Sequence, residues 1–421
     1  MNILIGKYGR STYFYKPSDY YNNYGGEDTI AKAYMHLVKC FPQHKFYYIG
    51  SNDLDKYIGF LAAKKPSNLI DLDSMIKRYA KDTGKYDTIG KLDESKEPFY
   101  HASVDFVDRE GLSFDMAFMF YNIKIPVTLY REGYLSQRKK TPLKLLCSNK
   151  IPSHIAYLIE NKKIPTIFIE DDPRQIGELP HDLSAIKEVW SQTNGTDVSM
   201  RFNDDKMTVS PVTVPIRYKQ IEKLFLIGKE RIDFTNPDCI KVGSETYSKS
   251  NEFIMALNGT PSRLGVLDEW IFSRRPNQVI YGKWVGLNDS LDKLIELSGK
   301  KENFVEKGMM TMQPDMWKAK YTFVPSVVAE HNNFVTQKIF SMLYFGIIPF
   351  WCKSQYDTDN IYKDFPDYIK VSNPDELWNK IDELNSNKEK YVSLLKQLYD
   401  LIPESYFDGS IMKDIFSEVL G

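Results

Sequence analysis

Residues 321–351, with the sequence YTFVPSVVAEHNNFVTQKIFSMLYFGIIPFW, constrain the fold of this chain more than any other stretch. They begin with an apolar, β-branched run that predicts a buried strand. Apolar residues then recur at helical spacing over 334–345, with Asn333 as the N-cap and Gly346 as the stop. A second apolar run follows at once and predicts another buried strand. A helix between two such strands joins them in parallel, so we expect a parallel α/β sheet.

The start of the predicted helix is a candidate anion site. Exposed N–H groups at a helix N-terminus carry a partial positive charge, on which a phosphate can bind. Lys338, in the first turns, adds a full charge. Because every α/β domain has several such units and most bind nothing, the alternative is a helix start that only supports the fold.

Length and composition bound the class of protein. A chain of 421 residues is too long for one ordinary hydrophobic core, which predicts two domains. The net charge of −1 means that any nucleic-acid binding must come from a local basic patch. The four cysteines contain no C-x-x-C pair, which argues against zinc and disulfide frameworks and fits a reducing cytoplasm. No apolar run reaches the length of a membrane span, and nothing indicates an obligate protein partner.

The first part of the chain has the pattern of a Rossmann-like half. A strand, a Tyr- and Gly-rich loop, a helix and a second strand are predicted over residues 2–50. Further buried strands are predicted over 114–121 and 164–170, whereas most of 51–107 is polar without a clear pattern. The first strand is not followed by G-x-G-x-x-G, which argues against a dinucleotide site.

Asp171 and Asp172 directly follow the strand predicted over 164–170. Acids at the carboxyl end of a parallel strand lie where open α/β sheets bind their ligands. One of the two can act as a general base on a substrate hydroxyl, and adjacent side chains point in different directions, so only one need act. The alternative is a helix N-cap, which aspartate also favours.

Asp71-Leu-Asp73 has the D-x-D spacing that some sugar transferases use for a metal. Two acids at this spacing are common by chance, so we expect no metal site here.

The segment YREGYLSQRKK, over residues 130–140, interleaves aromatic and basic side chains. Tyr134, Arg138 and Lys139 are candidates to hold a nucleic-acid phosphate backbone. The alternative is the solvated end of a helix.

A proline-containing segment over 211–215 predicts a linker to a second domain. There a strand ends in the turn Asn258-Gly-Thr-Pro-Ser-Arg263, where glycine lets the backbone approach a ligand closely. A helix and another strand follow this turn. The predicted parts are an N-terminal domain over 1–212, a second Rossmann-like domain over 213–400, and a C-terminal helix over 401–421 that packs back on the first domain.

Four segments carry a family resemblance through their order and spacing. They are Ile169-Glu-Asp-Asp-Pro-Arg174, Asn258-Gly-Thr-Pro-Ser-Arg263, Asn333-Phe-Val-Thr-Gln-Lys338 and Gly346-Ile-Ile-Pro-Phe-Trp-Cys-Lys353. Together they resemble the phage DNA glucosyltransferases that modify 5-hydroxymethylcytosine, which have the two-domain GT-B fold. The first is similar to the segment with the family's catalytic aspartate, and the second to a glycine/serine/arginine loop. The third is similar to an Asn-Phe-Ile-Thr-Leu-Arg element, and the fourth to Gly-Thr-Ile-Pro-Val-Phe-Trp-Lys.

The resemblance implies an α/β protein with two Rossmann-like domains facing a central cleft. It implies that Asp172 takes the proton of the acceptor, with Asp171 as the rival. The residues implied for the donor are Gly259, Thr260, Arg263, Met309, Met310, Asn333, Lys338 and Ser341. Lys338 stands where the family has an arginine, and Ser341 where it has a ribose-binding glutamate, for which Glu330 or His331 could substitute.

The function implied by the resemblance is sugar transfer to DNA in the cytoplasm of an infected bacterial cell. UDP-glucose or UDP-arabinose would donate the sugar to the hydroxymethyl group of 5-hydroxymethylcytosine in double-stranded phage DNA, with the target base flipped out. Mg²⁺ is an optional aid to product release, and the donor sugar and the inverting or retaining outcome stay open. The alternatives are a GT-B enzyme that acts on a glycan or small molecule, and a non-catalytic DNA-binding protein on the same scaffold.

Overall fold

The computed structural model divides the chain into two compact units. One comprises Met1–Leu224 with Ser410–Gly421, and the other comprises Phe225–Gly409. The described residues are 1–8, 26–49, 65–87, 96–121, 154–170, 186–191, 217–220, 224, 232–234, 236, 238–256, 265–276, 278–281, 304–305, 315–325, 337–353 and 363–421. The linker predicted over 211–215 lies outside them and stays a prediction. Within the described ranges, no helix is long and apolar enough to cross a membrane.

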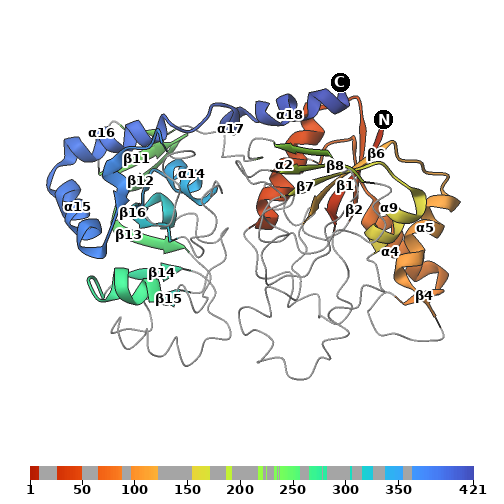
Figure 1. Ribbon diagram of the computed structural model, residues 1–421, viewed down its shortest axis with the longest axis horizontal. Helices are drawn as coiled ribbons and strands as arrows, with labels where there is room; N and C mark the ends of the chain where they lie inside the picture. The colour runs from red at the N-terminus through yellow and green to blue at the C-terminus, as the bar shows by residue number, and fades with distance from the viewer. Residues whose placement is uncertain are drawn as a thin grey trace. The chain divides into compact units, whose positions relative to one another are not determined.

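The described part of the first unit is built on a parallel sheet of seven strands (Figure 1). Their order is β3-β2-β1-β6-β7-β8-β9. The strands are β1 Asn2–Tyr8, β2 Lys45–Ile49, β3 Leu69–Asp71, β6 Met116–Tyr121, β7 Thr166–Glu170, β8 Ile186–Ser191 and β9 Arg217–Gln220. A separate short ribbon pairs β4 Tyr86–Asp87 with β5 Glu97–Pro98. The order of the large sheet runs outward from β1 in both directions, so the sheet is doubly wound with a switch point between β1 and β6.

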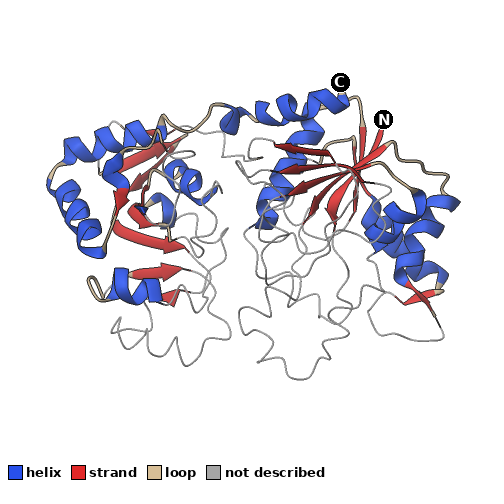
Figure 2. Ribbon diagram, viewed as in Figure 1, coloured by secondary structure: helices blue, strands red, loops and turns tan. Residues whose placement is uncertain are grey.

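Helices cover both faces of this sheet (Figure 2). They are α2 Gly26–Cys40, α4 Leu72–Thr83, α5 Phe99–Arg109, α9 His154–Lys162 and α18 Ser410–Leu420. Ala117 and Met119 of β6 share a core with α4, α5 and α9. Phe118, between them in the strand, packs against Phe416 of α18, with ring centroids 4.9 Å apart. Burial on both faces explains why the central strands β6 and β7 are nearly continuous apolar runs.

The last helix of the chain, α18, packs on the first unit. The ring of Phe416 lies 5.2 Å from that of Trp190 on β8, and the ring nitrogen Nε2 of His44 bonds to the Leu420 carbonyl at 2.9 Å. Lys219 of β9 pairs with Glu418 of the same helix. Contacts to several strands and to the loop before β2 therefore tie the end of the chain to this unit.

The described part of the second unit contains a parallel sheet of six strands in the order β15-β14-β13-β16-β17-β18. They are β13 Asn251–Ala256, β14 Val279–Tyr281, β15 Phe304–Val305, β16 Ala319–Phe323, β17 Ile348–Cys352 and β18 Lys370–Val371. Counted from β13, this is the 3-2-1-4-5-6 order of the Rossmann fold, with the switch point between β13 and β16. The predicted α/β fold class is confirmed in both units.

The second unit has further elements around this sheet. A small antiparallel sheet consists of β10 Ile232–Asp233, β11 Cys239–Val242 and β12 Glu245–Ser248. The helices are η2 Leu267–Phe272, α14 Gln337–Tyr344, η5 Asp367–Ile369, α15 Pro374–Ser386, α16 Lys388–Tyr399 and α17 Ser405–Asp408.

The stretch 321–351 forms the parallel unit expected from its sequence, since β16 and β17 pair in parallel with α14 between them in the chain. β16 ends at Phe323, earlier than predicted, and residues 326–336 lie outside the described ranges. Gly346 ends the helix at φ +64°, a conformation that glycine adopts without strain. The N–H of Gly346 donates to the carbonyl of Leu343 at 2.8 Å, and the N–H of Ile347 donates to the carbonyl of Met342 at 3.0 Å. This is the hydrogen-bond pattern of a Schellman motif.

Lys249 is buried at the amino edge of the second sheet and holds three chain segments together. Its ammonium precedes β13 and donates to the carbonyl oxygens of Ala319 at 2.6 Å, Gly346 at 2.8 Å and Phe345 at 3.0 Å. Carbonyls at the end of a helix lack partners within the helix, and three acceptors match the three donors of an ammonium. Burial lowers the pKa of Lys249 well below its usual value, and the nearby charge of Lys320 lowers it further.

Replacing Lys249 by methionine should destabilise the protein, because three buried carbonyls lose their donor. An unsatisfied buried acceptor costs about 1–3 kcal/mol, so we expect the free energy of unfolding to fall by about 3 kcal/mol. Lys241→Met, at an exposed position of β11, is the matched control and should change it by less than about 0.5 kcal/mol. Urea unfolding followed by circular dichroism measures both variants, and equal stabilities would contradict the assigned role.

Candidate functional site

The segments that follow β13, β15 and β16 carry the residues predicted for a donor. In a doubly wound sheet the carboxyl ends of the strands share one edge, and ligands bind there beside the switch point. Gly259, Thr260 and Arg263 follow β13, Met309 and Met310 follow β15, and Asn333, Lys338 and Ser341 follow β16. The three strands that precede these segments therefore end at the same edge of the sheet. Of these residues the structure describes Lys338 and Ser341, and the contacts of the others stay predictions.

Lys338 and Ser341 lie three positions apart on α14 and share one face of the helix. Both side chains are half-buried, whereas Ile339, Met342 and Leu343 are buried in the core. α14 ends shortly before β17 begins, so the end of the helix lies at the amino edge and its first turn at the carboxyl edge. This orientation places a lysine and the positive end of a helix dipole on the ligand side of the sheet.

The π-helix η2 begins shortly after the turn 258–263, which carries residues predicted to bind the donor. The N–H of Ser273 bonds at 3.0 Å to the carbonyl of Asp268, five residues earlier, as in a π-helix. Trp270 stacks on Phe323, the last residue of β16, with ring centroids 4.5 Å apart and planes 15° apart. The carbonyl of Trp270 also accepts the indole N–H of Trp378 at 2.8 Å. These contacts fix η2 against the carboxyl end of β16.

The side chains predicted for the acceptor side lie outside the described ranges. In the sequence Asp171 and Asp172 follow Glu170, which is the last residue of β7 and lies at the carboxyl edge of the sheet. β7 pairs with β6, which borders the switch point of the first sheet. Tyr134, Arg138 and Lys139 also lie outside the described ranges. Their roles stay predictions.

The two acids of the D-x-D pattern have structural partners. Asp71 accepts the N–H of Ser74 at 2.9 Å and caps α4. Asp73 turns into the core and pairs with His154 Nε2 at 2.9 Å and with Lys77 Nζ at 2.5 Å. In the part of the chain that the structure describes, no three His, Cys, Asp or Glu side chains gather to hold a metal ion.

Asp73 and His154 join two helices at the carboxyl edge of the first sheet. α4 begins where β3 ends, and α9 ends just before β7 begins, so the first turns of both helices lie on the ligand side. Burial by itself would raise the pKa of Asp73, but the hydrogen bond and charge of His154 and the charge of Lys77 lower it below its usual range. An ionised carboxylate only accepts, so His154 Nε2 carries the hydrogen. The sequence gives no sign of His154, because 81 positions separate the pair.

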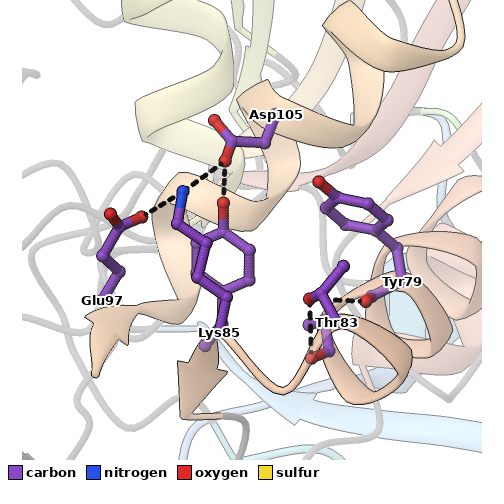
Figure 3. A network of polar contacts seen from close by, with 7 residues as sticks. Tyr79, Thr83, Lys85, Glu97 and Asp105 are labelled. Carbon is purple, nitrogen blue, oxygen red and sulfur yellow. Dashed lines mark hydrogen bonds and ion pairs between the residues drawn. The ribbon is translucent and has the colours of Figure 1, made fainter. Parts of the chain in front are cut away.

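A second polar network lies at the surface between α4 and α5 (Figure 3). The ammonium of Lys85 lies 2.8 Å from Glu97 and 3.2 Å from Asp105, and the Tyr86 hydroxyl donates to the same Asp105 carboxylate. The hydrogen bond to Glu97, followed by that to Asp105, raises the pKa of Lys85. Exposed ion pairs of this kind stabilise a protein little. We interpret the network as polar contacts that hold the β4–β5 ribbon against α5.

Comparison with known proteins supports the fold. Neither a family model nor a curated protein sequence matches the chain. The DNA-modifying enzyme β-glucosyltransferase is similar in structure at a TM-score of 0.52 and 12% identity, over 100% of this chain and 99% of that chain. T4 phage BGT in complex with UDP and Mn²⁺ is similar at a TM-score of 0.53 and 11% identity, with the same coverage of the two chains. Anabaena Alr3699/HepE in complex with UDP-glucose is similar at a TM-score of 0.56 and 10% identity, over 100% of this chain and 99% of that chain. The chain thus has the α/β fold of these proteins, two Rossmann-like units of the GT-B type.

Asp73→Asn should lower the free energy of unfolding at neutral pH by about 3 kcal/mol, because His154 and Lys77 lose a buried anionic partner. The folded-state pKa of Asp73 lies below its unfolded value. The contribution of Asp73 to the free energy of unfolding is therefore complete above about pH 4. It is lost as the pH falls from there toward the pKa of Asp73 in the folded protein. The difference from the wild type should thus shrink below about pH 4.

Urea unfolding at a series of pH values measures this difference. Asp82→Asn, at an exposed position of the same helix, is the control and should show little effect. A stability difference that stays constant down to about pH 3 would contradict the assignment.

Proposed function

We propose that the protein transfers a sugar from a UDP-sugar to the hydroxymethyl group of 5-hydroxymethylcytosine in double-stranded DNA. The observation that carries the proposal is the strand order of the second sheet, because the three strands that precede the predicted donor segments end at one edge. The likeness to a DNA-modifying β-glucosyltransferase and to a protein in complex with UDP-glucose supports it. Glucose and arabinose are both candidate donor sugars.

The donor diphosphate is proposed to bind at the carboxyl edge beside β13 and β16. Backbone N–H groups around Gly259 and Thr260, with the Arg263 side chain, would contact it from one side of the switch point. Lys338 and the first turn of α14 would contact it from the other side. These positive groups stabilise the charge that develops as UDP leaves. Met309 and Met310 are proposed to meet the uracil, and Asn333 and Ser341 complete the donor side.

The acceptor is proposed to react on the first unit, at the carboxyl end of β7. Asp172, or Asp171 as the alternative, takes the proton of the acceptor hydroxyl. The acceptor oxygen then bonds to the anomeric carbon of the sugar. The bond between that carbon and the phosphate oxygen breaks, and its electron pair stays on the oxygen of the departing UDP. The target base must leave the duplex to react, and Tyr134, Arg138 and Lys139 are proposed to hold the strand.

Mg²⁺ is proposed only as an aid to the release of UDP. The described residues include no cluster of carboxylates that fits it, and one similar structure holds Mn²⁺ together with UDP. No step of the transfer is assigned to a metal.

A second candidate is a glycosyltransferase that acts on a glycan or small-molecule acceptor. The likeness to Anabaena Alr3699/HepE, whose structure contains UDP-glucose, supports the donor side that both candidates share. This candidate keeps the donor site and predicts no binding to hydroxymethylated duplex in a gel-shift assay. A non-catalytic DNA-binding protein is a further alternative, for which Asp172→Asn would leave every activity unchanged.

Transfer is tested by incubating hydroxymethylated duplex DNA with a panel of UDP-sugars. Mass spectrometry of the released nucleosides should show 5-hydroxymethylcytosine heavier by one hexose or one pentose. Unmodified duplex of the same sequence is the control. If no UDP-sugar adds mass to the hydroxymethylated base, the proposed acceptor is wrong.

Lys338→Met should weaken UDP binding about tenfold, since a hydrogen bond to a charged group contributes about 1.5 kcal/mol. Lys338→Arg should retain or improve the affinity, because its planar group can bind a phosphate with two hydrogen bonds. Lys241→Met is the matched control and should bind UDP like the wild type. Isothermal titration with UDP measures all three, and an unchanged affinity in Lys338→Met would remove this residue from the donor site.

A further inference from the structure

The ammonium of Lys249 joins the strand before α14 to the turn after it. Of its three acceptors, the carbonyl of Ala319 begins β16, whereas those of Phe345 and Gly346 directly follow the last residue of α14. Lys249 itself shortly precedes β13, which pairs with β16. The ammonium therefore ties the end of the helix to the two strands that border the switch point.

The surroundings of this ammonium are dry. Lys249 is 5% exposed. A methyl group on Gly346 would lie 3.4 Å from Nζ of Lys249, and it would lie 3.5 Å from the buried side chains of Ile232 and Ile240. Hydrogen bonds from a charged donor are strong and directional, and low-dielectric surroundings strengthen them. These three bonds therefore oppose a shift of the end of α14.

Apolar contacts hold the rest of α14 on the sheet. Ile339 and Leu343 are buried, and the ring of Phe340 lies 6.0 Å from that of Phe365. Apolar attraction has no preferred direction. It therefore fixes the distance between helix and sheet more firmly than the position of the helix along its own axis. The directional bonds of Lys249 supply this second constraint.

The helix transmits the constraint to the opposite edge of the sheet. α14 is eight residues long, which corresponds to about 12 Å. Its backbone hydrogen bonds make it a rigid element, so a shift at Gly346 moves the first turn by a similar distance. Lys338 lies in that turn, where the donor diphosphate is proposed to bind. Because hydrogen bonds are formed at about 2.7–3.2 Å, a displacement of about 1 Å weakens this contact.

We propose that Lys249 is a positioning residue for the donor, which fixes α14 along its axis so that Lys338 and the first turn of the helix meet the diphosphate. This inference rests on the proposed function, because Lys249 acts through the donor contacts assigned there. Lys249 lies at the amino edge of the sheet and Lys338 at the carboxyl edge, so Lys249 acts without touching UDP. Without the lysine, α14 occupies more than one position, and the affinity for UDP falls with the fraction of molecules in the competent position.

A double-mutant cycle tests the coupling between the two lysines. Isothermal titration measures the UDP affinity of the wild type, Lys249→Met, Lys338→Met and the double variant. Lys249→Met should weaken UDP binding about fivefold, which is within the range of measured couplings between distant sites. In the Lys338→Met background the same substitution should weaken binding less than about twofold, because the contact that the helix positions is already lost.

Leu384→Ala separates positioning from a general loss of stability. Leu384 is 1% exposed in α15, and its truncation leaves a cavity in the same unit. This variant should lower the free energy of unfolding about as much as Lys249→Met does, but it should bind UDP like the wild type. All variants are titrated at a temperature at which circular dichroism shows them to be folded.

Gly346→Ala is a milder change to the same turn and decides the question if Lys249→Met does not fold. It keeps the lysine but strains a residue that has φ +64°. Because alanine disfavours this conformation, the turn that Lys249 holds should shift, and UDP binding should weaken about twofold.

Unchanged UDP affinity in Lys249→Met, or in Gly346→Ala where Lys249→Met does not fold, overturns this inference alone. Equal weakening by Leu384→Ala overturns it as well, and so does an effect of Lys249→Met that stays about fivefold in the Lys338→Met background. A wild type that does not bind UDP overturns the donor site of the proposed function, and this inference with it. A wild type that binds UDP but modifies no hydroxymethylated base overturns only the proposed acceptor.

Discussion

Burial of both sheets on both faces is the constraint on which the rest of the structure depends. A parallel strand covered by helices on each side can meet a ligand only at its ends. In the second unit the ammonium of Lys249 occupies the amino end, where it satisfies the carbonyls that end α14 and begin β16. The carboxyl end is the edge at which we propose that the donor binds. The same geometry applies to the first sheet, where Asp73 and His154 lie at the carboxyl end.

The strands and the helix of 321–351 could be predicted because their signals are local. β16 and β17 are apolar runs, and the turn at Gly346 needs a residue that tolerates positive φ. Most of residues 51–107 show no clear pattern in the sequence, and the described elements there give a related reason. On α4, an otherwise polar helix, the buried apolar residues are only Leu72, Ile76 and Ala80, and β3 is only three residues long. Such short signals do not exceed the chance pattern of a polar sequence.

The partners of buried polar groups could not be predicted, because no local rule links residues far apart in the chain. The D-x-D spacing is an example. Spacing alone cannot tell a metal site from a helix cap beside a buried ion pair, and the partner that decides, His154, lies 81 positions away. Lys249 is another example, since its acceptors Phe345 and Gly346 are almost a hundred residues later in the chain. The predicted donor residues at 258–263 and 309–310 lie outside the described ranges, so for them the structure adds only the strand that each follows.

The division of residues between the two units supports a reaction with two substrates. In the described part of the chain each large sheet has one switch point, and sheets of this kind bind ligands at the carboxyl edge beside it. The glycine- and arginine-containing turn and the lysine of α14 belong to the second unit, which suits an anion such as a diphosphate. The acids predicted to act as the base follow β7 of the first, which suits the proposed hydroxyl acceptor. A single dinucleotide would need a glycine fingerprint after β1, and the sequence there has none. This division of the predicted residues is what the proposed transfer from a charged donor to a hydroxyl acceptor requires.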